Sequence, residues 1–192
     1  MITAFYSDPH FGHDNIINFC DRPFKDVDDM DTQLIDNYNE LIKEDDTVLW
    51  LGDCFFGSTD YAKDIMYELH GNKILVCGPI EDRITRMLKI GFSVVLHFCY
   101  VNVAEQTCLA RHYPYPGTKH RDGRNVDDYV DTHLNPIKSQ ILLHGHTHTN
   151  IKRLGNQIHV GVDAWDYKPA LLTDVEDLVK ELRPSKESAV GY

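Results

Sequence analysis

Paired cysteines are the first feature that this sequence lacks. The chain has five cysteines, an odd number, and no two of them are spaced as Cys-x-x-Cys. This pattern argues against a disulfide framework and against a cysteine zinc site. We therefore expect reduced thiols and a cytoplasmic location.

Long apolar runs and excess positive charge are also missing. No apolar run approaches the length of a transmembrane helix, and residues 1–8 lack the basic stretch that begins a signal peptide. Lys plus Arg is 19 against 30 for Asp plus Glu, so the formal charge is −11. A chain this acidic is a poor generic binder of nucleic acid or anionic membrane. A bound metal ion would still provide local positive charge for a phosphate ester.

The composition is otherwise that of a globular protein, with 42% hydrophobic and 26% charged residues in 192. This length is enough for one domain with a real core. We predict a single domain over residues 1–183, followed by a frayed tail over 184–192.

Apolar strands alternate with amphipathic helices in the first half of the chain. There we expect strands at 2–6, 47–51 and 73–77 and helices at 15–20, 31–42, 61–69 and 82–89, with an Asp cap at the second helix. Later we expect antiparallel strands at 94–96, 99–103 and 107–110, a strand at 141–143, a hairpin from 151 to 162 that turns at Gly155, and a helix at 174–182. This order indicates an α/β sandwich of two packed sheets with helices outside.

The segment His144-Gly145-His146-Thr147-His148 is the most informative in the chain. Its three imidazoles directly follow the apolar residues 141–143, so we expect a strand to deliver them to a loop at the end of a sheet, where ligands bind in α/β folds. Neutral imidazole is the commonest protein ligand of transition metals. The segment therefore predicts a metal site.

Other predicted strands also end in potential ligands: Asp8 with His10, then Asp53, then His112. Carboxylate oxygens combined with imidazole nitrogens suit Mn, Fe, Ni or Zn better than Mg or Ca. One Asp can bridge two ions about 3.5–4 Å apart. Taken singly, Asp8 and Asp53 could be turn or cap residues, and His112 could be a buried core histidine.

Four short motifs resemble those of the calcineurin-like metallophosphoesterase superfamily: Asp8-x-His10, Gly52-Asp53, Arg111-His112 and Gly145-His146-Thr147-His148. Segments 7–17, 22–24, 52–57 and 162–169 are similar to small bacterial and phage members of that superfamily. The resemblance implies a four-layer α/β/β/α sandwich. It also implies two divalent transition-metal ions, with Mn as the first choice and Fe, Ni or Zn as alternatives.

The resemblance also implies roles for individual residues. One ion would be held by Asp8, His10, Asp53 and His148, and the second by Asp53, His112 and His146. The implied reaction is hydrolysis of a phosphodiester, such as a nucleotide or cyclic nucleotide, by in-line attack of a metal-bound hydroxide. The partner would then be a small phosphorylated substrate. A phosphomonoesterase is the alternative.

One motif departs from the superfamily pattern. Where the pattern reads Gly-Asn-His-Asp or Gly-Asn-His-Glu, this chain reads Gly78-Pro79-Ile80-Glu81-Asp82-Arg83. Pro79 has no side-chain donor for a metal, so the second site is expected to be weaker. Glu81 or Asp82 could replace the missing ligand, and His13, His120 or Arg83 could contact the phosphate and leaving group. The opposing interpretation is a catalytically weak protein that binds a phosphorylated ligand.

We name His13, Arg83 and Arg111 as catalytic candidates. His13 lies three residues after His10, and Arg111 precedes His112. Arginine is suited to bidentate phosphate contacts. The remaining candidates are assigned supporting roles: a basic patch of Lys119, His120, Arg121 and Arg124 within a polar insert or lid at 118–135, and Asp163 and Asp166, which would fix a loop or orient an imidazole.

Overall fold

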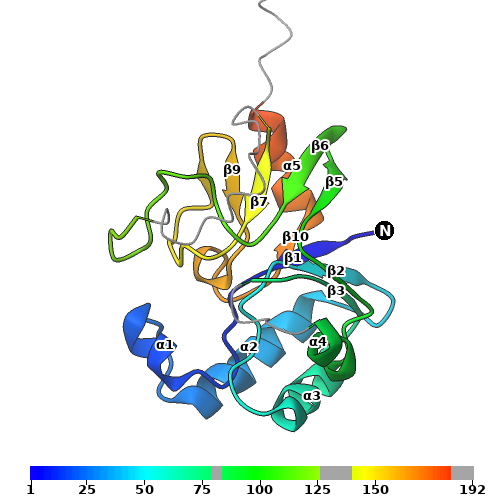
Figure 1. Ribbon diagram of the computed structural model, residues 1–192, viewed down its shortest axis with the longest axis vertical. Helices are drawn as coiled ribbons and strands as arrows, with labels where there is room; N and C mark the ends of the chain where they lie inside the picture. The colour runs from blue at the N-terminus through cyan, green and yellow to red at the C-terminus, as the bar shows by residue number, and fades with distance from the viewer. Residues whose placement is uncertain (79–83, 126–139, 183–192) are drawn as a thin grey trace, which may run out of the picture.

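The computed structural model describes residues 1–78, 84–125 and 140–182. In these ranges the chain forms two five-stranded sheets that pack on one another, with helices α1 to α4 gathered on the far side of the first sheet (Figure 1). The altered motif from Pro79 to Arg83, part of the predicted insert, and the predicted tail lie outside the described residues.

The first sheet contains β1 (Ala4–Tyr6), β2 (Thr47–Trp50), β3 (Asn72–Val76), β4 (Val94–Leu96) and β10 (Ala170–Leu171) in the order β10-β1-β2-β3-β4. Strands β1 to β4 are parallel, and β10 pairs antiparallel with β1. The prediction of an antiparallel strand at 94–96 was wrong, because the chain crosses over through helix α4 (Ile84–Ile90) and returns parallel to β3.

The second sheet contains β5 (Cys99–Val103), β6 (Gln106–Ala110), β7 (Leu142–His144), β8 (Arg153–Leu154) and β9 (Gln157–His159) in the order β5-β6-β7-β9-β8. The pairs β6·β7 and β7·β9 are parallel, and the outer pairs β5·β6 and β8·β9 are antiparallel hairpins. The hairpin from β8 to β9 contains Gly155 with φ +60°, as the sequence predicts.

The remaining helices are α1 (Asp14–Phe19), α2 (Val27–Leu41), α3 (Thr59–Glu68) and α5 (Leu172–Glu181). Helix α2 begins four residues earlier than predicted, because the Asp26 carboxylate accepts a hydrogen bond from Asp29 N and caps it. Asp31 is therefore not the cap. It is buried within α2 and accepts hydrogen bonds from Gly12 N and Tyr61 Oη. No helix in the described ranges is long and apolar enough to cross a membrane.

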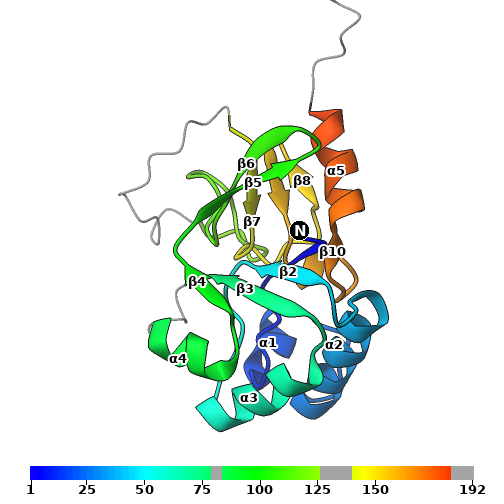
Figure 2. The same ribbon diagram turned by 90° about the vertical axis from the view of Figure 1, so that its right-hand side faces the viewer.

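Two hydrophobic clusters hold these layers together. Tyr6 and Trp50 pack against residues of α2, α3 and α4 on one face of the first sheet. On the other face, Phe5 and Leu49 pack against the second sheet, and α5 contributes Val175 to the same cluster (Figure 2). The chain therefore has a mixed α/β fold of two mixed sheets with helices, which confirms the coarse α/β prediction.

The loops that follow β1, β2, β6 and β7 meet where the two sheets adjoin, because the parallel pairs β1·β2 and β6·β7 each end at one edge of their own sheet. Main-chain hydrogen bonds join the loops: Asp8 N donates to Gly52 O at 3.1 Å, and Gly145 N donates to His112 O at 3.0 Å. Val162 N also donates to Ser7 O at 3.0 Å. The predicted ligands are thus placed by a framework that uses both sheets.

Candidate metal centre

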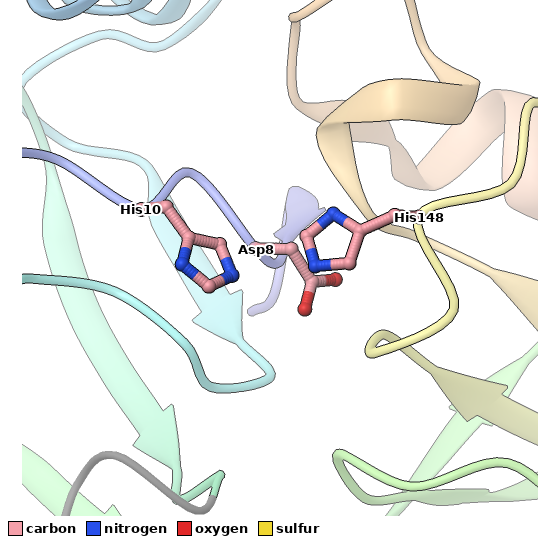
Figure 3. A group of neighbouring side chains, drawn as sticks. All are labelled: Asp8, His10 and His148. Atoms are coloured by element: carbon pink, nitrogen blue, oxygen red, sulfur yellow. The ribbon is translucent and has the colours of Figure 1, made fainter. Parts of the chain in front are cut away.

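The converging loops bring the six predicted ligands into two groups. In each group, one ligand atom from every residue lies within 4.8 Å of the others: Asp8, His10 and His148 form one group, and Asp53, His112 and His146 form the other. In Figure 3 the His10 and His148 rings flank the Asp8 carboxylate. The structure thus brings together the residues that the sequence singled out.

Asp53 lies between the two groups. Its Oδ2 is 3.5 Å from His10 Nε2, and its Oδ1 is 3.6 Å from His112 Nε2. Each carboxylate oxygen therefore faces an imidazole of a different group. This is the placement that a carboxylate shared by two ions would need.

Five of the six residues have a left-handed backbone. The φ angles are +59° at Asp8, +56° at His10, +53° at Asp53, +71° at His146 and +52° at His148. This conformation costs a residue with a Cβ atom about 1–2 kcal/mol. Such residues persist only where the surrounding structure enforces them, and they cluster at functional sites. Their concentration here indicates a site selected for side-chain placement rather than for local stability.

Main-chain packing around Asp8 requires a glycine at position 145. His146 N donates to both Asp8 oxygens, at 2.9 and 3.0 Å. A Cβ atom on Gly145 would lie 2.5 Å from Asp8 Oδ2. A side chain at this position would therefore displace the carboxylate.

Hydrogen bonds orient two of the imidazoles. His112 Nδ1 lies 2.6 Å from Leu51 O, which leaves Nε2 toward Asp53 and 3.0 Å from His146 Nδ1. His148 Nδ1 lies 2.8 Å from Asp163 Oδ2, and its other ring nitrogen points toward Asp8 in Figure 3. A fixed donor nitrogen sets the tautomer and presents the other nitrogen to a metal. Asp163 thus orients an imidazole, as predicted.

Arg22 holds Asp163 in place, a role that sequence reasoning missed. Its Nε and Nη2 donate to the two Asp163 oxygens at 3.0 and 2.9 Å. Its Nη1 and Nη2 also donate to Pro9 O and Asp8 O, both at 2.8 Å. The side chain is fully buried. One guanidinium therefore links the strained Asp8 loop to the carboxylate that orients His148.

The pKa values favour metal ligation at most of these groups. Burial lowers the pKa of His10 to about 4, although Asp53 acts in the opposite direction. Burial, assisted by the charge of His112, also lowers the pKa of His146. Burial would raise the pKa of Asp53, but His112 and His10 hold it well below its usual value. Neutral imidazoles and an ionised carboxylate are the forms that bind metal.

His148 and Asp8 behave differently. Burial acts to lower the pKa of His148, but hydrogen bonds to Asp163 and Cys20 and the charge of Asp8 raise it well above its usual value. Burial raises the pKa of Asp8, against the charges of His148 and His112. A metal ion that binds His148 must displace a proton, so its binding weakens as the pH falls.

The donor set fits a transition-metal ion. His10 Nε2 is buried and forms no hydrogen bond within the described segments, and it faces Asp53 Oδ2. Imidazole nitrogens combined with carboxylate oxygens suit Mn, Fe, Ni or Zn. Three protein ligands per group leave coordination positions for water and substrate. In a third group, Cys20 with His148 and Asp163, the ligand atoms also lie within 4.8 Å of one another, but Asp163 is already engaged by Arg22 and His148.

Two of the catalytic candidates occupy other places than predicted. Arg111 is engaged within its own loop: its buried guanidinium donates to Tyr113 O and Pro114 O, both at 2.7 Å. His13 lies beside the candidate ligand His10. Its Nδ1 is 3.3 Å from His10 Nδ1, and its ring stacks on Phe56 with the ring centroids 3.9 Å apart.

His144 does not join the other two histidines of its segment. It is the last residue of β7 and points to the same face as Leu142, away from Leu143 and the cluster between the sheets. Its Nδ1 lies 2.8 Å from Gly145 O, and its ring stacks on His159. The prediction that all three imidazoles lie in one loop was therefore wrong for His144.

A cavity of about 650 Å³ lies over the centre. Its lining includes Asp53, His146 and His148 together with the basic residues His120, Arg121 and Arg124. The His120 ring lies 4.5 Å from that of His146, centroid to centroid. Of the residues proposed to replace the altered motif, His120 is thus placed at the cavity. Trp165 packs in the core, where its Nε1 donates to His159 O at 2.7 Å.

The buried histidines predict that the metal-free protein loses stability below about pH 6.5. Burial lowers the pKa of His10 and His144 to about 4. Each therefore stabilises the fold above its unfolded pKa, and this contribution falls by about 1.4 kcal/mol per pH unit as the pH drops from 6.5 toward 5. His148, whose pKa is raised, contributes a slope of the opposite sign near and above pH 6.5, where its unfolded form loses the proton first, and this contribution becomes small as the pH approaches 5.

Urea unfolding of metal-stripped protein at several pH values between 6.5 and 5 measures this slope. His144→Asn should flatten it by the contribution of one histidine, whereas His97→Asn, at an exposed position, should leave it unchanged. A stability profile without slope in this range would contradict the burial of neutral imidazoles.

Comparison with known proteins places the chain among sequences of similar length. An uncharacterized protein of Methanocaldococcus jannaschii is 27% identical over 186 residues, which cover 91% of this chain and 89% of that protein. The gene 66 protein of Mycobacterium phage D29 is 29% identical over 203 residues and covers 93% of this chain and 96% of its own length. No family model matches the chain.

A solved structure shares the fold. The crystal structure of a protein of unknown function from Aquifex aeolicus superimposes with a TM-score of 0.69 at 27% identity, covering 91% of this chain and 97% of that one. The gene 66 protein of Mycobacterium phage L5 is 30% identical over 191 residues, which cover 85% of this chain and 87% of that protein. At this identity over most of both sequences, the chain belongs to the family of the phage L5 gene 66 protein.

Proposed function

We propose that this chain is a metal-dependent phosphoesterase of the calcineurin-like type, with a phosphodiester as its preferred substrate. The observation that carries the proposal is the position of Asp53, whose two oxygens face His10 of one ligand group and His112 of the other. Two ligand groups that share a carboxylate are typical of two-metal hydrolases. The packed sheets, with helices outside the first, support the four-layer sandwich as the finer description of the fold.

Each ligand group would hold one ion, with Mn as the first choice and Fe, Ni or Zn as alternatives. The group of Asp53, His112 and His146 is expected to bind more weakly, because Pro79 offers no side-chain ligand. Bound divalent ions would lower the pKa of a shared water and neutralise charge on the phosphoryl group.

The residues around the cavity have distinct roles in this proposal. Arg121 and Arg124, which pair with the exposed carboxylates of Asp21 and Asp122, would exchange these partners for the phosphate oxygens. His120 would donate a hydrogen bond to the leaving group. Burial, assisted by the charge of Arg124, lowers the pKa of His120, so the neutral ring predominates at pH 7 and offers a hydrogen bond rather than a proton. Substrates with good leaving groups should therefore react fastest.

The cavity size favours a diester, because about 650 Å³ leaves room for groups on both sides of a phosphate. A phosphomonoesterase is the alternative within the same chemistry. The altered motif at residues 78–83 also supports a second alternative: a catalytically weak protein that binds a phosphorylated ligand. Hydrolysis assays with a diester and with a monoester separate these three functions.

We expect the metal-stripped protein to hydrolyse bis-p-nitrophenyl phosphate once Mn, Ni, Zn, Fe or Mg is restored, and to do so faster than p-nitrophenyl phosphate. His146→Ala should reduce turnover by about 100-fold or more, because it removes a ligand. His97→Ala, which replaces an exposed histidine, is the matched control. Metal binding without turnover of either compound would favour the binding protein.

A further inference from the structure

A second cavity of about 490 Å³ lies beside the metal cavity, on the outer face of the second sheet. The two cavities share three lining residues: His120, Arg121 and Thr147. The floor is made by His144 and His159, which are partners in the register between β7 and β9. A molecule at the metal centre could therefore extend into this second cavity past a wall that is common to both.

The charge of this second cavity is opposite to that of the protein as a whole. The chain has a net charge of −11, yet the described lining contains Lys119 and Arg121 and no carboxylate. The hydroxyls of Thr147 and Thr149, 3.4 Å apart, also belong to the lining. The carboxylate of Asp21 lies 3.5 Å from Arg121 Nη2 but outside the lining, and that pair is exposed. Cations and hydroxyls with no carboxylate in the lining itself are a suitable setting for an anion.

His159 supplies an independent indication that a ligand binds here. Its side chain is only 2% exposed, and its ring nitrogens have no hydrogen-bond partner at ordinary distance and angle among the described residues, apart from a weak contact with the Thr149 main chain. Asp8 Oδ2 lies 4.0 Å from its Nε2. Buried polar groups nearly always have a partner, and those that lack one often belong to sites for water or ligands. An imidazole N–H at the floor of the cavity could donate to an oxygen of a bound anion.

We propose that this cavity, here called the anion subsite, binds a second phosphate group of the substrate. The substrate class is then a phosphodiester that carries a further phosphate beyond the scissile bond. This assignment of a substrate rests on the proposed function, whereas the binding of an anion by Lys119, Arg121 and the threonine hydroxyls does not.

Binding is tested with inorganic phosphate on the metal-stripped full chain, followed by NMR shifts of the Thr149 and Asn150 amides. The matched variants are Leu154→Glu and Leu154→Gln, because Leu154 lines the subsite and is 54% exposed. A carboxylate there should raise the dissociation constant of phosphate about fivefold, from a like-charge repulsion near 1 kcal/mol. The Leu154→Gln variant should bind like the unmodified chain.

Two results would overturn the anion subsite. One is a set of shifts confined to the metal cavity, with Thr149 and Asn150 unchanged. The other is equal phosphate affinity of Leu154→Glu and Leu154→Gln. Both variants lie at an exposed position, and their thermal unfolding temperatures show whether each is folded.

Use of the subsite by a substrate is tested with two diesters that differ by one phosphate: the dinucleotide ApA and its 5′-phosphorylated form pApA. With Mn restored, we expect kcat/KM to be higher for pApA than for ApA. Leu154→Glu should reduce kcat/KM for pApA about fivefold and leave kcat/KM for ApA unchanged. Equal rates for both diesters would overturn the substrate class. If neither diester nor bis-p-nitrophenyl phosphate is hydrolysed, the proposed function fails, while the phosphate titration still decides the subsite.

Discussion

Asp53→Asn is expected to remove bound metal and hydrolytic activity together. The side chain keeps its shape but loses the charge and one of the two oxygens that face His10 and His112. Both ligand groups then lose the carboxylate between them. We expect a fall in kcat/KM of about 10³-fold, because charge stabilisation by bound ions is among the largest contributions in such sites.

Metal content per chain after dialysis, measured together with hydrolysis of bis-p-nitrophenyl phosphate, checks this expectation. Asp60→Asn is the matched control, because its side chain is 90% exposed and lies outside both ligand groups. Unchanged metal stoichiometry in a folded Asp53→Asn chain would rule out the shared role. Loss of metal with retained activity would rule out a metal-dependent reaction.

Arg22→Met is expected to destabilise the protein by about 3–5 kcal/mol, because it leaves the Asp163 carboxylate buried without its cation. Both side chains of this pair are almost fully buried, at 0% and 1% exposure. The carbonyl groups of Asp8 and Pro9 also lose their donors. Urea unfolding of the metal-stripped variant measures this loss.

A double variant separates the two consequences of that substitution. Arg22→Met combined with Asp163→Asn removes both charges, so much of the stability should return. Metal affinity should remain about 10–100-fold weaker, because no carboxylate orients the His148 ring. Arg121→Met, which breaks an exposed pair with Asp21 at 3.5 Å, should change stability by less than about 1 kcal/mol. Full recovery of metal affinity in the double variant would contradict the orienting role of Asp163.

Local patterns in the sequence were enough to predict most of the elements and all six residues of the two groups that could hold a metal ion. Hydrophobic period and length located the strands before Asp8, Asp53, His112 and His146, because a buried strand must be apolar whatever its partner. A ligand that directly follows such a strand falls at the sheet edge by necessity. The turn at Gly155 could also be predicted from local sequence, because it depends on a backbone conformation that glycine adopts easily.

Contacts between distant parts of the chain decided the rest. Arg22 and Asp163 are separated by 141 positions, so no local pattern could reveal that they form a pair. The parallel direction of β4 depends on how α4 packs, and the role of Arg111 depends on the carbonyls that surround it. His144 and His146 are two residues apart and have similar neighbours in the sequence. Only the folded structure shows that His144, the last residue of β7, faces away from the candidate metal centre while His146 reaches it. The sequence determined which residues could bind a metal, and the tertiary structure decided which of them lie close enough to hold one together, because convergence is a property of the packed sheets.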